Sequence, residues 1–498
     1  MKKFIIRFKS QDAHLFFIKK NPLWYAVVLI LINVSVNAQQ VSDKVFRAGA
    51  ATSNITPKIG TSINGNMKDG IVKQIHDETQ ARCIVLDDGK TKLAMLTVDL
   101  CMIYREELDA AKRRASELTG IPVENMMMSA IHTHSGGTAC SVFQSDPDPE
   151  YLKFLRERIA DAVVRANNNL VPAQIGWAVG REDSQVFNRR WKMKPGKPLM
   201  NPFGEVDQVK MNPGVGNPDR LEPSGPVDPG LPIISVQTLE GRAIALLANY
   251  SLHYVGGTAP GEISADYFGM FAERMKELLE SDNEGFPPFV AMLSNGTSGN
   301  INNINWFANE APPAMPPYVK MRQVANIVAA EAYKTYQTIR YQNWISLSSA
   351  QTEISLGVRL PKKEEIERAK GIIAKAHGPI MNSMEEIYAR ETMLIKDFPK
   401  QMPLILQAFR IGDLAITAAP VEIFVEIGLE IKEKSPFKPT FTTSLANGYN
   451  GYLPTPEHHK LGGYETWRAR SSYLEVDAST KVTRTLFELL NKLKNEQP

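Results

Sequence analysis

The chain has 498 residues, of which 43% are hydrophobic and 22% are charged, and its formal net charge at pH 7 is +3. This is an ordinary globular composition, and the chain is long enough to bury a large core. Residues 1–38 carry six Lys or Arg and one Asp, so the remainder has a net charge of −2, which excludes an electrostatic basis for binding nucleic acid.

The N-terminus has the pattern of an export signal. Basic residues precede an apolar run from Leu23 to Ile32, and the small residues of Val36-Asn37-Ala38 precede Gln39. We therefore predict a signal peptide over residues 1–38, cleavage near Ala38, and a secreted or periplasmic protein. The alternative is a single membrane anchor, for which the apolar run is short.

The three cysteines are odd in number and widely spaced, at Cys83, Cys101 and Cys140. They predict neither a disulfide framework nor a cysteine-rich zinc site. Cys140 lies close to the His-Thr-His sequence at 132–134, but nothing nearby marks it as a nucleophile.

The remaining pattern predicts a mixed α/β fold, with mixed β-sheets flanked by helices in one large domain over residues 39–498. Two strands at 82–86 and 93–99 are joined by an Asp-Asp-Gly-Lys turn. Helical spacing occurs at 105–119, 149–168 and 362–396. Residues 192–232 are rich in Pro and Gly and read as a long substrate-side loop.

The first candidate site is a His-Thr-His sequence, His132 to His134, that follows an apolar run and precedes two glycines. This reads as a buried strand that ends in a tight turn. Side chains two apart on a strand share a face, so both imidazoles would project side by side from the strand end. Two imidazoles suit zinc; the alternative is one buried, hydrogen-bonded His and one surface His.

Three further segments carry polar residues at strand ends. His253 follows a strand and precedes paired glycines, and Glu422 lies in an apolar setting, where a carboxylate is costly unless it is paired or bound to metal. The loop from Asn295 through Gly296 to Asn300 would expose backbone N–H groups to an oxyanion, or is a plain connection. Asp99 closes a strand and is either an orienting carboxylate or a helix N-cap.

Together these segments resemble the catalytic domain of the neutral, non-lysosomal ceramidases. The matches follow one another along the chain: Asn-Ile-Thr-Pro at 54–57, His-Thr-His-Ser-Gly at 132–136, Asn188-Arg189, His253, the loop at 295–300, Pro-x-Glu at 420–422, and Asn-x-Tyr with Tyr-Leu-x-Thr-Pro-Glu at 447–457. The chain departs from the family at residues 296–300 and at Val421. It is expected to be a short form without the family's immunoglobulin-like C-terminal domain.

The resemblance implies one Zn²⁺ held by His132, His253, Glu422 and Tyr449. It also implies that His134 and Arg189 act on the substrate's polar groups. Asp99 and Arg82 are candidates for orienting the zinc-bound histidines, which usually need a hydrogen-bond partner.

We therefore expect a zinc-dependent hydrolase that cleaves an N-acyl amide, such as a ceramide-like lipid, by metal-activated water. The absence of a Gly-x-Ser-x-Gly sequence agrees with a mechanism without an acyl-enzyme. We expect the substrate to be a lipid or another small molecule. A lipid substrate is compatible with peripheral contact between the protein and a membrane. The alternatives are a zinc-dependent esterase or deacylase acting on glycans, or a non-catalytic exported binding protein with the same fold.

Overall fold

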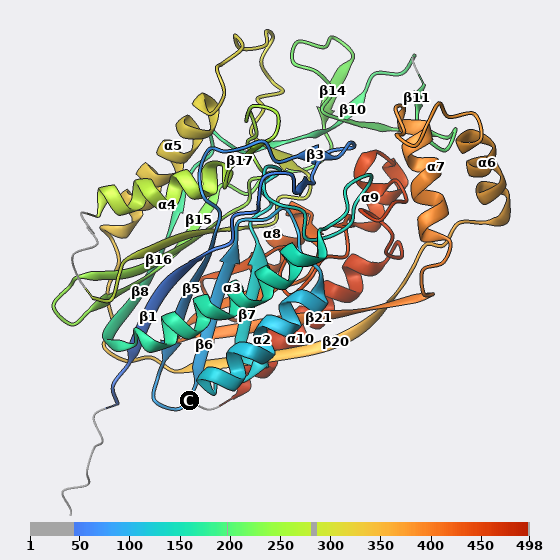
Figure 1. The fold of residues 1–498 in the computed structure, drawn as a ribbon. Helices are drawn as coiled ribbons and strands as arrows, with labels where there is room; N and C mark the ends of the chain where they lie inside the picture. Colours follow the sequence, from blue (N-terminus) through green and yellow to red (C-terminus); the bar gives the residue numbers. More distant parts are fainter. Residues whose placement is uncertain (1–43, 197, 280–285, 497–498) are drawn as a thin grey trace, which may run out of the picture. The chain divides into compact units, whose positions relative to one another are not determined.

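The computed structural model describes residues 44–196, 198–279 and 286–496, and its central element is an eight-stranded sheet (Figure 1). The strand order is β18-β16-β15-β8-β1-β5-β6-β7. Neighbouring strands are antiparallel except for two parallel pairs, β16 with β18 and β6 with β7. The strands are β1 (Arg47–Asn54), β5 (Gln80–Asp87), β6 (Lys92–Val98), β7 (Met126–Ala130), β8 (Val171–Arg181), β15 (Gly230–Thr238), β16 (Ala243–Tyr250) and β18 (Val290–Asn295).

A second sheet of four strands packs against one face of the first. It has the order β20-β21-β22-β24. Its strands are β20 (Leu347–Gly357), β21 (Gln401–Ile411), β22 (Leu414–Ala418) and β24 (Thr440–Thr443). Alternation along β5 explains the packing, because Ile84 and Leu86 join the core between the two sheets while Cys83 and Val85 join the core on the opposite face.

Helices cover the two outer faces (Figure 1). The core of the eight-stranded sheet continues into α2 and α3 at one side and into α4 and α5 at the other, and the four-stranded sheet packs on α8 and α10. The result is a helix–sheet–sheet–helix arrangement, which confirms the predicted mixed α/β class. The helices are α2 (Arg105–Thr119), α3 (Pro149–Asn168), α4 (Asp266–Leu278), α5 (Val319–Tyr336), α6 (Lys363–Ile373), α7 (Met384–Ile395), α8 (Val425–Lys434), α9 (Pro456–Leu461) and α10 (Ala478–Asn495), with short 3-10 turns at η1 (Val123–Asn125) and η2 (Tyr464–Thr466).

The two edge strands of the large sheet meet at their C-terminal ends. The side chain of Asn295, at the end of β18, donates to the carbonyls of Ile131 and Leu252, each at 3.3 Å. Ile131 follows β7 and Leu252 follows β16, so this one amide ties together the turns that carry His132 and His253. The twist and coiling of the sheet make this closure possible.

Two sequence predictions fail in detail. The segment 192–232 is not a structureless loop, because β10 (Arg190–Met193) pairs with β13 (Val209–Met211) and β14 (Arg220–Pro223), and β11 (Leu199–Met200) pairs with β12 (Val206–Asp207). The predicted helix over 362–396 is two helices, α6 and α7. Gly378, with φ of 103°, and the following Pro379 lie between them.

The remaining strands are short. They are β2 (Ser62–Ile63), β3 (Gly70–Ile71), β4 (Gln74–Ile75), β9 (Phe187–Asn188), β17 (Glu262–Ile263), β19 (Ile301–Asn302), β23 (Glu422–Ile423) and β25 (Tyr452–Leu453). Within the ranges that the structure describes, no helix has the length and apolar character needed to cross a bilayer. The predicted signal peptide lies outside those ranges.

A buried polar network fixes the turn that precedes Tyr449. Asn447 has a left-handed backbone, with φ of 64°. Its backbone N–H donates to the carbonyl of Met128 at 2.7 Å, and its side-chain oxygen accepts from the ammonium of Lys112 at 2.7 Å. Its amide nitrogen donates to Gln407 at 2.8 Å. The network joins β7, α2 and β21 to this turn.

This network predicts a pH dependence of stability. Burial lowers the pKa of Lys112 to about 8, whereas the ordinary value in an unfolded chain is about 10.4. Between these values the folded state has released a proton that the unfolded state still holds, so this group makes the fold more stable as pH rises. We expect the free energy of unfolding of the wild type, relative to Lys112→Met, to increase by up to about 3 kcal/mol between pH 7 and pH 10.5.

Urea unfolding of both proteins across that range measures the difference. Lys90→Met, at an exposed turn position, is the matched control, for which we expect a difference that stays constant with pH. A constant difference for Lys112→Met as well would contradict the prediction.

Candidate metal centre

The His-Thr-His sequence lies in the turn after β7 rather than on the strand. The strand ends at Ala130, and His132 has a left-handed backbone with φ of 74°. The prediction that both histidines share a strand face is therefore wrong in its geometry. Their Nε2 atoms are nevertheless only 3.3 Å apart, and the N–H of His132 is held by the carbonyl of Leu100.

His253 and Glu422 converge on His132 from distant parts of the chain. The Nε2 atoms of His132 and His253 are 3.0 Å apart. Oε2 of Glu422 lies 3.3 Å from Nε2 of His132 and 3.7 Å from Nε2 of His253. Tyr449 donates from its hydroxyl to Oε1 of Glu422 at 2.9 Å. The structure thus brings together all four residues that the resemblance names as ligands.

The tautomers of the two histidines are set by backbone carbonyls. Nδ1 of His132 lies 2.9 Å from the carbonyl oxygen of Cys101, and Nδ1 of His253 lies 3.0 Å from that of Ser298. A carbonyl only accepts, so each Nδ1 carries the hydrogen, and each neutral ring has its lone pair at Nε2. Two Nε2 atoms and a carboxylate oxygen therefore face one another in a buried space, which is unfavourable unless a proton or a metal cation lies between them.

The pKa shifts of the three histidines also favour a cation at this site. Burial lowers the pKa of His253 and of His134 well below the ordinary value, which keeps both rings neutral. At His132 burial also opposes the charged form, but the contacts with Cys101 and with the Glu422 carboxylate outweigh it and raise the pKa well above the ordinary value. The cluster therefore attracts one positive charge.

The donor set fits a divalent metal ion. His132, His253 and Glu422 form a group whose ligand atoms all lie within 4.8 Å of one another. Ligands of a tetrahedral zinc with Zn–N bonds near 2.0–2.1 Å are separated by about 3.3 Å, which matches the observed spacing. Oε2 of Glu422 is buried and makes no hydrogen bond within the described chain, as expected of an oxygen reserved for a metal.

His134 lies beside this group. Its ring stacks on Tyr254 with centroids 3.6 Å apart, and its buried Nδ1 has no hydrogen-bond partner among the described residues. Gly65 leaves room for the ring, because a Cβ there would lie 2.6 Å from it. His134, His132 and Cys101 also form a group of possible ligands, so its role as a helper rather than a ligand stays a prediction.

Arg189 is buried near the centre and is firmly held. Its Nε donates to Glu465 at 2.9 Å, and one Nη donates to the carbonyl of Gly299 at 2.8 Å and to the hydroxyl of Tyr452 at 3.1 Å. Its charge lowers the pKa of both His134 and His253, after the larger effect of burial. Arg189 thus contributes a fixed positive charge to the site.

The predicted orienting pair, Asp99 and Arg82, does not orient the histidines. The two side chains are 2.5 Å apart and bond to each other, and Asp99 also accepts from the N–H of Gln80 at 2.8 Å. The partners of the histidine Nδ1 atoms are the carbonyls of Cys101 and Ser298 instead. Asp99 lies two residues before Cys101, and its hydrogen bonds fix the end of β6 to β5.

The loop at 295–300 is not an open oxyanion hole. The N–H groups of Gly296, Thr297 and Gly299 donate to Tyr250, Ser251 and Ile423 within the protein. The side chain of Asn300 accepts from the N–H of Val425 at 2.9 Å and donates to Glu426. The Ser298 carbonyl of this loop orients His253. A substrate-binding role for Asn295, Gly296 and Asn300 stays a prediction, which these internal hydrogen bonds do not support.

Sequence reasoning missed the residues that act through their backbones. The carbonyls of Cys101 and Ser298 leave no signature in residue type, and the bridging role of Asn295 depends on the meeting of two edge strands. Tyr254 and Tyr452, which contact His134 and Arg189, could have been noticed because each lies one or a few residues from a predicted ligand.

Comparisons with known proteins support the resemblance and the fold. No family model matches the sequence. A neutral ceramidase of Pseudomonas aeruginosa is 22% identical over 500 residues, which cover 88% of this chain and 70% of that protein. The crystal structure of neutral ceramidase from Pseudomonas aeruginosa superposes with a TM-score of 0.68 at 19% identity, over 92% of this chain and 75% of that one.

A further solved structure, a ceramidase complexed with C2, has the same TM-score of 0.68 at 18% identity, over 92% of this chain and 76% of that one. The similarity thus extends over nearly all of the described residues, in sequence and in three dimensions. The resemblance indicated by the ordered motifs is confirmed: over most of its length this chain resembles the neutral ceramidases, and it has their fold.

Proposed function

We propose that this protein is an exported, zinc-dependent amidohydrolase that cleaves an N-acyl amide of the ceramide class. The observation that carries the proposal is the convergence of two Nε2 lone pairs and a carboxylate oxygen, with both Nδ1 atoms fixed by carbonyls. The similarity to neutral ceramidases supports the choice of an amide substrate. The N-terminal pattern of basic and apolar residues supports export.

Zinc suits this donor set better than magnesium or calcium, which prefer oxygen ligands. His132, His253 and Glu422 would hold it, and Tyr449 would complete the set as the resemblance implies. When bound, zinc lowers the pKa of a water molecule to about 7 and polarises the scissile carbonyl. Cys101 and Ser298 would keep the two imidazoles in the tautomer that binds a metal.

The neighbouring side chains would transfer protons and bind polar groups of the substrate. Neutral His134, whose Nε2 lies 3.3 Å from that of His132, would accept the proton released as water attacks the carbonyl carbon. It would pass that proton to the nitrogen that leaves when the C–N bond breaks. Arg189 would hold polar groups of the substrate with its fixed charge, through the hydroxyl of Tyr452.

The roles of ligand and helper are separable by mutation. We expect His132→Ala and Glu422→Ala to lose zinc and activity together, because each removes a ligand. We expect His134→Ala to keep its zinc and to lose about 10²–10⁴-fold in rate, as for removal of an acid–base group. Zinc content and rate of amide hydrolysis are measured on the same preparations.

The matched control is His377→Ala, an exposed histidine in the segment between α6 and α7, which should change neither quantity. Loss of zinc from His134→Ala with retention by His132→Ala would reverse the assignment. Full activity of the wild type with less than a tenth of an equivalent of zinc would rule out the proposed cofactor.

The substrate class is tested with a panel of ceramides, other N-acyl amides and acetylated sugars. We expect the zinc-loaded wild type to hydrolyse a ceramide or another N-acyl amide with kcat/KM at least a hundredfold above that for any acetylated sugar. A preference for the sugars would indicate a glycan deacylase. Binding without turnover on every substrate would indicate a binding protein.

A further inference from the structure

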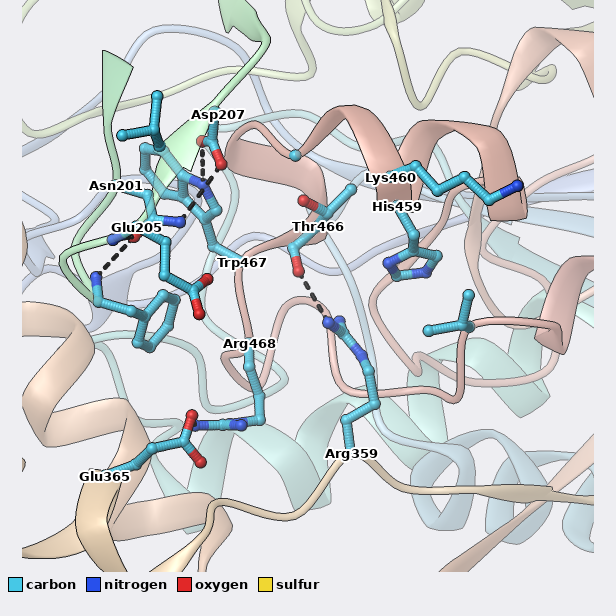
Figure 2. Close-up of a pocket in the computed structure, with 14 residues that line it drawn as sticks. Asn201, Glu205, Asp207, Arg359, Glu365, His459, Lys460, Thr466, Trp467 and Arg468 are labelled. Carbon is cyan, nitrogen blue, oxygen red and sulfur yellow. Dashed lines mark hydrogen bonds and ion pairs between the residues drawn. The ribbon is translucent and has the colours of Figure 1, made fainter. Parts of the chain in front are cut away.

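A pocket of about 310 Å³ lies away from the metal centre, between the β11–β12 turn, α6 and α9 (Figure 2). None of the four proposed zinc ligands lines it. Among the residues that line it are Asn201, Glu205, Asp207, Arg359, His459 and Lys460. Its size is that of a site for a small molecule.

The pocket and the metal centre share one wall, the segment 462–468. On one side of this segment, Glu465 accepts from Arg189 at 2.9 Å and from Arg190 at 2.6 Å. Thr466 and Trp467 line the pocket. A ligand in the pocket would therefore contact a rigid segment whose fold is fixed by a buried ion-pair triad.

One side of the pocket carries positive charge without a matching anion. Nε, Nη1 and Nη2 of Arg359 donate to the carbonyls of Leu474, Thr466 and Ser472, each at 2.8–2.9 Å, and Nη2 also donates to the Ser472 hydroxyl. Within the described chain no carboxylate pairs with this guanidinium. Burial, together with Arg468, lowers the pKa of Arg359 to about 10.

The same side holds His459 and Lys460 (Figure 2). Burial, together with the charges of Arg359 and Arg190, lowers the pKa of His459 to about 3. The imidazole is therefore neutral and keeps one N–H to donate. Among the described residues it has no hydrogen-bond partner, which leaves that donor for a ligand.

The opposite side carries the carboxylates of Glu205 and Asp207, and beside them Arg468, whose guanidinium pairs with Glu365 at 2.9 Å. Asn201, Glu205 and Asp207 face the cationic side across the pocket (Figure 2). Asp207 accepts from the indole N–H of Trp467 at 2.7 Å and from Asn201 at 3.3 Å. The side chain of Glu205 makes no hydrogen bond or ion pair within the described chain, and it is exposed to the pocket.

We propose that this pocket binds a small zwitterion, in which an anionic phosphate or carboxylate group is separated by a few bonds from an ammonium group. The anionic group would lie against Arg359, His459 and Lys460. The ammonium group would lie against Glu205 and the aromatic face of Trp467. Separated charges of opposite sign on the two walls favour such a ligand over a simple anion or cation.

The zwitterion has two possible sources, a free metabolite or a lipid headgroup. Met200 and Val206, at the outer edge of the β11–β12 turn, are 59% and 61% exposed. They would meet the apolar part of a lipid whose headgroup occupies the pocket.

Isothermal titration calorimetry of the full chain with phosphoethanolamine tests the site. We expect saturable binding of one equivalent, and roughly tenfold weaker binding of ethanolamine or inorganic phosphate, each of which has one of the two charges. Glu205→Gln should weaken phosphoethanolamine about tenfold and leave phosphate unchanged, and Lys460→Gln should weaken both. The matched control is Glu457→Gln, an exposed carboxylate on α9 outside the pocket, which should change nothing.

Co-sedimentation with phosphatidylethanolamine vesicles distinguishes the two sources. Vesicle binding that Glu205→Gln abolishes assigns a lipid headgroup, and binding of the free compound alone assigns a soluble metabolite. Lack of saturable binding of phosphoethanolamine by the wild type, or affinity unaffected by both Glu205→Gln and Lys460→Gln, would overturn the proposal.

Discussion

The structure of the site depends on one electrostatic constraint, the mutual approach of two imidazole lone pairs in a buried space. The carbonyls of Cys101 and Ser298 fix both Nδ1 hydrogens, so both Nε2 atoms face each other at 3.0 Å, with a carboxylate oxygen of Glu422 beside them. Without a cation this arrangement is repulsive. The surrounding fold holds it in place.

The closure of the large sheet provides that support. His132 follows an edge strand, and His253 follows the neighbour of the other edge strand. Asn295 links the two turns with one amide group. Glu422 lies in β23, which follows β22 of the four-stranded sheet, and the packing of that sheet on the first is set by the alternation of apolar residues. The centre is thus built from both sheets and cannot form from either alone.

Several strands and helices, and the two ligand histidines, could be predicted from the sequence because they depend on local patterns. The strands β5 and β6 and the helices α2 and α3 follow from alternation, turn chemistry and helical spacing within short windows. The histidines stand out because each follows an apolar run and precedes glycines. The ordered motifs supplied the remaining ligand candidates through resemblance.

The predictions that failed concern features that depend on contacts between residues distant in the sequence. The left-handed backbone of His132 is held by a hydrogen bond to Leu100. The N–H groups of Gly296, Thr297 and Gly299 donate to residues as distant in the sequence as Ile423. Asp99 pairs with Arg82 because β5 and β6 are adjacent, which removes it from the histidines. Residues 192–232 form small sheets whose pairing a Pro- and Gly-rich pattern conceals.

Anomalous X-ray diffraction on either side of the zinc absorption edge tests the central claim most directly, with crystals of protein purified without added metal. We expect a peak above the edge only, at roughly 2.0–2.2 Å from Nε2 of His132, Nε2 of His253 and an oxygen of Glu422. A catalytically active protein whose crystals lack anomalous signal at that point, with the two imidazoles still 3.0 Å apart, would contradict it.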